Sequence, residues 1–198
     1  MRRRVRGDAG QAFPIYITVV GGLLFLAFAY LAVGQAAANK NGAQTAADAA
    51  ALAAAQDRRD QLAGQWVTDI LDPTKWRDIF DGNAEGLDPS CGRADQLAAQ
   101  NDAVVLVCDP MGPLAYTVEV RTNKTVGESV IPGTADKQSK ASATAEIEPL
   151  CTFEPPTDDA ADDLLPRLTC KDRDWDLDPE DLGDLPEPKD LFDVHLAD

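Results

Sequence analysis

The sequence predicts an α+β fold. One N-terminal transmembrane helix continues into an Ala-rich helix, which packs on a small three-stranded antiparallel sheet and is followed by an acidic, largely disordered C-terminal tail. An uncharged apolar span from Ile15 to Val33, an alanine-dense run up to Gln56 and two later segments of alternating polarity predict this arrangement. The expected parts are a leader (1–12), a transmembrane helix (13–34), an exported domain (35–150) and the tail (151–198).

The apolar span is long enough to cross a bilayer as one helix, which takes about 20 residues. Arginines before a span favour the cytoplasmic side, so we expect the C-terminal domain outside the cell membrane. The alternative is a secretory signal cleaved near Ala37 or Asn39, but the apolar region of a signal is usually about 7–15 residues. Retention is therefore favoured. The arginines are Arg2, Arg3, Arg4 and Arg6.

The alanine run consists of strong helix formers and should extend the helix beyond the membrane. Its small side chains allow close packing, and the alternative is a plain linker helix. Asp48 could cap the helix, pair with Arg58 or Arg59 of a neighbouring chain, or mark the wet side, which we favour. The expected packing motif comprises Ala46, Ala47, Asp48, Ala49, Ala50 and Leu52.

Two helical segments should follow this run. Trp66, Val67, Ile70 and Leu71 recur at helical spacing and continue the first helix. Asp72–Pro73 then matches an N-cap followed by proline at the first helical position. This second helix should end at Gly82. Its expected inward side chains are Trp76, Ile79 and Phe80.

A third helix and three strands are predicted next. The helix covers residues 93–100 and leads into a buried strand over 103–108. Residues 114–121 and 141–148 alternate apolar and polar side chains, as half-buried strands do. The long connection between them has an apolar tip, Val130–Gly133, which could fold back or contact a partner.

All four cysteines fall on the expected exported side, where an even count indicates two disulfides. Three connectivities are open, and proximity in the sequence favours Cys91–Cys108 and Cys151–Cys170. No C-x-x-C motif occurs and His195 is the one histidine, so we expect no metal and no cofactor.

The tail is strongly acidic. From Glu154 onward, sixteen acidic and four basic residues leave a local charge of −12, out of −16 for the chain. Such a segment tends to stay extended. Alternating aspartates over 172–178 lack the glycine and glutamate of an EF-hand loop, which leaves a weak interaction with calcium or cell-wall cations as the alternative. The apolar-studded stretch Leu191–Leu196 could dock on a partner or on its own domain.

Composition also limits the function classes. A lone histidine in the tail offers no Ser-His or Cys-His geometry, and no phosphate-binding glycine loop occurs, so we expect no enzyme and no small-molecule substrate. A polyanionic exterior repels nucleic acid.

The N-terminal third resembles TadE/TadG-like pseudopilins of the Tad-type (Flp) pilus-assembly system. The resemblance rests on the Arg-rich leader, the single membrane helix and the Ala-Ala-Asp-Ala-Ala-Ala-Leu-Ala element over residues 46–53. It implies a membrane-anchored, non-enzymatic component that contacts lipid and other pilin-like or Tad assembly proteins through helix packing. The alternative is a tethered or secreted surface-binding protein unrelated to pili.

One departure concerns leader cleavage, for which Gly7 and Gly10 are the candidate sites. Pilin-like substrates of prepilin peptidase typically carry a glutamate five residues after the cleavage glycine. Those positions hold Ala12 and Ile15 here. The departure favours the TadG-like branch over a fibre-forming pilin.

Overall fold

The computed structural model describes residues 12–125, 136–155 and 165–197. The candidate cleavage glycines Gly7 and Gly10 and the predicted loop tip Val130–Gly133 lie outside these ranges.

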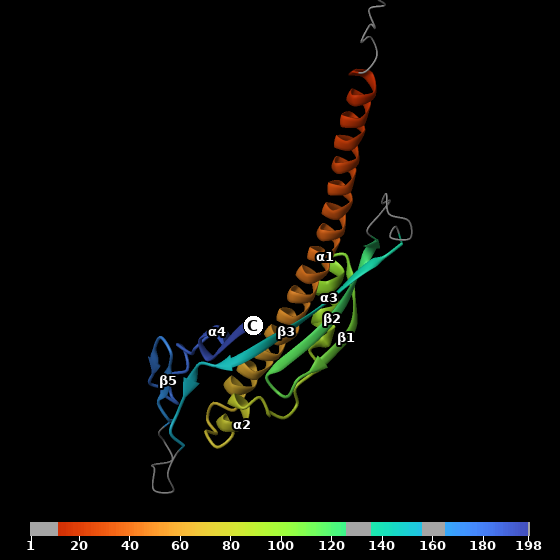
Figure 1. The fold of residues 1–198 in the computed structure, drawn as a ribbon. Coiled ribbons are helices and arrows are strands. Elements are labelled where there is room, and N and C mark those ends of the chain that lie inside the picture. The colour runs from red at the N-terminus through yellow and green to blue at the C-terminus, as the bar shows by residue number, and fades with distance from the viewer. Residues whose placement is uncertain (1–11, 126–135, 156–164, 198) are drawn as a thin grey trace, which may run out of the picture.

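One helix, α1 (Ala12–Thr68), dominates the molecule (Figure 1). Its 57 residues correspond to about 86 Å at 1.5 Å per residue. The first half extends freely away from the domain, and the second half runs along the sheet. Within the described residues, α1 contains the one stretch long and apolar enough to cross a membrane, with 6% of its most apolar window buried. This fits a single-pass membrane protein.

The main sheet has four antiparallel strands in the order β1-β2-β3-β7. The first three are β1 (Ala103–Pro110), β2 (Ala115–Thr125) and β3 (Gln138–Pro149), close to the predicted segments. The fourth, β7 (Phe192–Leu196), comes from the tail and pairs Val194 with Ile147 of β3. The prediction of three strands is therefore wrong by one, because this pairing joins segments far apart in the sequence.

The face of the sheet that holds Tyr116, Val118 and Val120 packs on α1. The opposite face carries polar side chains such as Thr117 and Glu119. A further helix, α3 (Cys91–Gln100), contacts both α1 and β1. The second half of α1 therefore has the sheet and α3 as partners, and its buried alanines form the centre of the core.

The described part of the tail is folded, which differs from the expected largely disordered segment. It forms a second sheet of β4 (Cys151–Thr152), β5 (Leu168–Cys170) and β6 (Asp174–Trp175). A short helix, α4 (Pro188–Leu191), then leads into β7. Leu191 and Phe192 are fully buried, so the apolar stretch near the C-terminus docks on its own domain.

The helix after α1 begins later than predicted. α2 spans Trp76–Phe80, and its N-cap residue is Lys75 rather than Asp72. Backbone turns over residues 70–75 replace the expected first turn, with the amide of Lys75 bonded to the carbonyl of Asp72. The inward side chains are as predicted, since Trp76, Ile79 and Phe80 are all buried.

Two further expectations are corrected. The strand over 103–108 was expected to be buried, but β1 lies at the edge of the sheet and exposes Val104 and Val107. Ile70 and Leu71 were expected to continue the first helix, but α1 ends at Thr68 and both lie in the turn that follows. Near this end, Trp66 is buried whereas Val67 is exposed. A step of one residue turns a side chain by about 100° around a helix, which carries Val67 off the face that packs.

Candidate functional site: the alanine-rich segment of α1

The alanine motif packs inside its own domain. Ala46, Ala47 and Ala50 have no exposed surface, and Ala49 and Leu52 are partly buried. The fully buried positions of this segment extend over about half of the helix circumference at 100° per residue. Alanine is the side chain that lets the sheet and α3 approach one helix so closely. The fully buried alanines are Ala43, Ala46, Ala47, Ala50, Ala51, Ala54 and Ala55.

Asp48, the one charged residue of the motif, is half-buried rather than on a freely wet side. Its Oδ1 atom accepts a 2.8 Å hydrogen bond from Nε2 of Gln44, one turn earlier. Both residues line a hollow of about 250 Å³ together with Ser142, Thr144 and Leu196. The carboxylate therefore faces the junction of α1 with β3 and β7.

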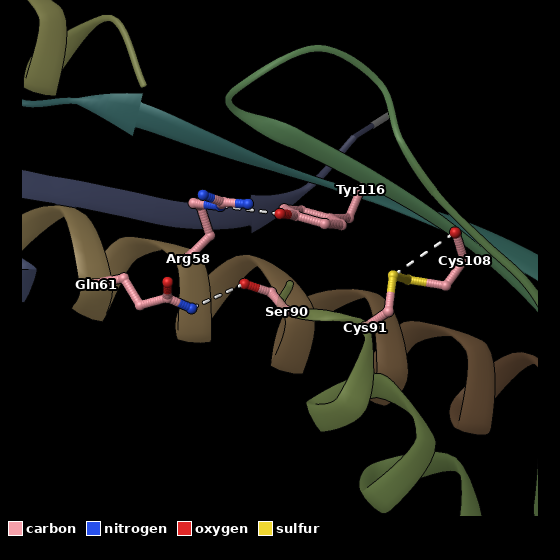
Figure 2. Close-up of a disulfide and its surroundings, with 6 residues drawn as sticks. All are labelled: Arg58, Gln61, Ser90, Cys91, Cys108 and Tyr116. Atoms are coloured by element: carbon pink, nitrogen blue, oxygen red, sulfur yellow. Dashed lines mark hydrogen bonds between the residues drawn. A yellow bond between two sulfur atoms is a disulfide. The ribbon is translucent and has the colours of Figure 1, made fainter. Parts of the chain in front are cut away.

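The arginines considered as partners of Asp48 have other contacts within the chain. Arg58 Nε donates a 2.9 Å hydrogen bond to the Tyr116 hydroxyl, and the guanidinium lies 6.0 Å from the centre of that ring (Figure 2). Arg59 pairs with Asp60 at 2.8 Å. The sequence analysis did not identify the Arg58–Tyr116 contact, because a helix–strand distance leaves no local pattern.

Figure 2 shows a second link on the same stretch of α1. Gln61 Nε2 lies 3.3 Å from the Ser90 hydroxyl, and its Oε1 accepts a 2.7 Å bond from the amide of Asp88. Ser90 is buried and directly precedes α3. Gln61 thus fixes the segment that leads into α3 against α1.

Two disulfides hold the outer parts of the domain. Cys91 at the start of α3 is bonded to Cys108 in β1, as Figure 2 shows. Cys151 is bonded to Cys170 and joins β4 to β5. This is the pairing that sequence proximity favours. The second bond attaches the first part of the acidic tail to the end of β3.

At its other end, the packed segment of α1 meets the ends of β2 and β3. Asn39 Nδ2 donates to the carbonyl of Lys124 at 3.2 Å. Lys40 Nζ donates to the carbonyl of Lys140 at 2.6 Å. These bonds fix the strand ends beside the helix six to seven residues after the apolar span.

Acidic groups of the tail take part in two clusters of interest. Asp174 and Asp176 of the alternating run both pair with Arg167, at 3.4 and 3.2 Å. Glu148, Asp193 and His195 instead meet on the wet face of β3 and β7, with ligand atoms within 4.8 Å of one another and all three side chains exposed. Sequence analysis missed this second group, because it depends on the β3–β7 register.

Residues 10–57 match the protein family described as "Putative Flp pilus-assembly TadE/G-like". The match covers the apolar span and the alanine motif, so the TadE/TadG-like resemblance is confirmed over the first half of α1 and into the domain. Comparison with curated proteins finds no match, and comparison with solved structures finds none either.

Proposed function

We propose that this chain, whose residues 10–57 carry the TadE/G-like segment, is a single-pass membrane component of a Tad-type pilus-assembly or related surface-secretion system. Its leader (1–12) lies in the cytoplasm, residues 13–34 span the membrane, and the folded domain and tail (35–150 and 151–198) lie outside. The family match supports a structural role with protein partners rather than a catalytic one.

The observation that carries the proposal is the continuity of α1. The family-matching segment begins in an apolar stretch whose side chains are exposed, as Phe25 (72%) and Leu31 (56%) illustrate, and it ends in the fully buried alanines of the domain. Exposed apolar surface of this length is stable in lipid but not in water. One uninterrupted helix therefore joins a lipid-facing half to a packed half.

The direction of insertion is supported by two features. The arginine-rich start favours the cytoplasmic side. The two disulfides lie in the part that would be translocated, and disulfides persist in oxidising compartments.

The packing of the domain limits which part of α1 is free to contact other helices. We expected the anchor and the Ala-rich motif both to pack beside other pilin-like helices, but the alanines are already covered by the sheet and α3. In the proposed mechanism, other pilin-like or Tad proteins contact the free half of α1, residues 13–38. The domain surface then carries contacts to the assembly machinery.

Site-specific photo-crosslinking in the native membrane tests this mechanism. A photoreactive phenylalanine at Leu24 (55% exposed, free half of α1) should capture a pilin-like or Tad platform protein, whereas the same group at Val67 (45% exposed, far end of α1) should not capture that partner. Retention in the membrane without any Tad protein captured at Leu24 would instead support a tethered surface-binding protein.

The mature N-terminus tests anchoring and processing. Intact mass and N-terminal sequencing of the membrane fraction should show either Met1 or a start at Asp8 or Gln11, after Gly7 or Gly10. A start near Ala37 or Asn39 with the protein in the medium would overturn membrane anchoring. Without reductant, the mass should lie about 4 Da below the reduced value, one hydrogen for each of four cysteines.

A further inference from the structure

The membrane-side end of the domain is basic, unlike the rest of the domain and the tail. Five cationic side chains lie near the ends of β2 and β3 and on the adjacent turn of α1, and we call them the basic rim. They stand out because the chain as a whole has a charge of −16. The basic rim consists of Lys40, Arg121, Lys124, Lys137 and Lys140.

Hydrogen bonds to α1 fix the height of the basic rim along the helix. The bonds from Asn39 to the carbonyl of Lys124 and from Lys40 to the carbonyl of Lys140 hold both strand ends at one level. Lys40 follows Val33, the end of the apolar span, by seven residues, or about 10 Å of helix. Each headgroup layer of a bilayer is about 5–7 Å deep, so long lysine side chains at this level reach it.

Acidic neighbours offset only part of this charge. Lys124 pairs with Asp102 at 2.6 Å, and Lys140 pairs with Glu119 at 3.2 Å. Both lysine side chains stay largely exposed, at 76% and 58%. Besides Asp102 and Glu119, the described residues near the basic rim include a third carboxylate, that of Asp136, which directly precedes Lys137.

The remaining cations of the basic rim keep a positive excess. Within the described ranges, Lys40, Lys137 and Arg121 form no ion pair. With three carboxylates against five cations, the described part of this end has a net positive charge. The second sheet of the acidic tail lies away from this end of the domain (Figure 1).

We infer that the basic rim binds the anionic lipid headgroups of the leaflet from which α1 emerges. This inference rests on the proposed membrane insertion. Cations near a charged bilayer are attracted over about a Debye length, which is about 8 Å at physiological salt. The rim draws this end of the domain onto the lipid, while the acidic tail is repelled from the same surface. The domain is thereby held upright with a fixed face toward the membrane.

Hydrogen exchange of the full chain in nanodiscs tests the inference. In discs containing phosphatidylglycerol, amides in residues 119–125 and 136–142 should exchange several-fold more slowly than in phosphatidylcholine discs. The difference should disappear at about 0.5 M salt, where screening is stronger. Amides in residues 66–80, at the far end of the domain, should exchange equally in both.

Two double variants, each of which removes two lysines, distinguish an effect of the basic rim from an effect of the net charge of the chain. Lys124→Gln/Lys137→Gln should abolish the difference between the two lipids. Lys171→Gln/Lys189→Gln, which removes two exposed lysines from the tail, should keep it. For each variant, the exchange rate in one lipid is divided by the rate in the other. Any local effect of losing the Lys124–Asp102 pair is present in both rates and cancels in this ratio.

Failure of the inference can be told apart from failure of the proposed function. A chain that alkaline extraction releases from phosphatidylcholine vesicles is not inserted, and the proposed function fails. A chain that stays inserted but exchanges equally in both lipids overturns the basic rim alone. Equal protection in detergent by a soluble phosphate polymer would also overturn the assignment to lipid, in favour of a general polyanion site.

Discussion

Arg58 of α1 donates a 2.9 Å hydrogen bond through Nε to the hydroxyl of Tyr116 in β2. Tyr116 is 1% exposed, so this bond lies inside the interface between the long helix and the sheet. It places a guanidinium and a phenol in an interface whose other buried side chains are largely apolar. Because a hydrogen bond is directional, this contact specifies the position of α1 along the strand. Burial of methyl groups is non-directional and specifies that position less well.

Removing the Tyr116 hydroxyl should weaken this interface without opening it. Tyr116→Phe leaves the Arg58 Nε–H without its acceptor while keeping the ring beneath the guanidinium. The expected cost is about 0.5–1.5 kcal/mol in the free energy of unfolding. Chemical unfolding of the full chain in detergent measures it, with the exposed Tyr30→Phe as control. A variant as stable as the control would show that the bond contributes nothing.

The alanine face gives a second prediction. Ala50 has no exposed surface, so Ala50→Leu must insert three carbons into a packed interface. Overpacking of this kind typically costs about 1–3 kcal/mol. Ala38→Leu, on the exposed part of the same helix, is the matched control and should leave stability unchanged. Equal stability of the two variants in denaturant titrations would contradict the close packing that we describe.

Local patterns predicted most of the central fold. Alternation over 114–121 and 141–148 located β2 and β3, and the apolar span with its alanine continuation located α1. The fourth strand was missed because pairing of Val194 with Ile147 joins distant segments, and the charge around β7 suggested an extended tail. Burial of Leu191 and Phe192 outweighs that self-repulsion in the described residues.

The candidate site was predicted less completely. The alanine spacing correctly indicated a packing helix but not which surfaces cover it. The Asp48 hollow, the Arg58–Tyr116 bond and the Glu148–Asp193–His195 group all depend on how separate elements meet. No periodicity in one segment can reveal such contacts.

The segment that joins α1 to α2 contains an ion pair with a defined pH dependence. Lys75 Nζ lies 2.6 Å from Asp69 Oδ1. The hydrogen bond from Lys75, helped by one from Gln65, lowers the pKa of Asp69. The same bond to Asp69 raises the pKa of Lys75.

The two shifts act at opposite ends of the pH scale. The Asp69 contribution to stability is present above its unfolded pKa, about 3.9, and is lost as pH falls through the lower folded value. The Lys75 contribution is present below about pH 10.4 and is lost as pH rises through the higher folded value. Lys75→Gln should therefore flatten the plot of unfolding free energy against pH at both its acid and its alkaline end. Curves that stay parallel from about pH 2 to about pH 11 would contradict a role for this pair.

Gly82, just after α2, provides the sharpest test of local packing. Its φ is +78°, and a Cβ atom placed there would lie 2.7 Å from Leu114 Cδ2 and 2.8 Å from Pro113 Cβ. Gly82→Ala therefore adds a steric clash to an unfavourable backbone conformation. Gly86 has the same φ of +78°, but a Cβ atom added to it would meet nothing within 4 Å, so Gly86→Ala isolates the backbone cost.

The comparison of the two glycines separates the two effects. Gly86→Ala should lose about 1 kcal/mol of unfolding free energy, the usual cost of a left-handed non-glycine residue. Gly82→Ala should lose clearly more, because Pro113 and Leu114 must shift in the turn that leads into β2. Thermal unfolding of both full-length variants in the same detergent measures the difference. Equal losses would show that the turn yields freely and that Gly82 is there for its backbone conformation alone.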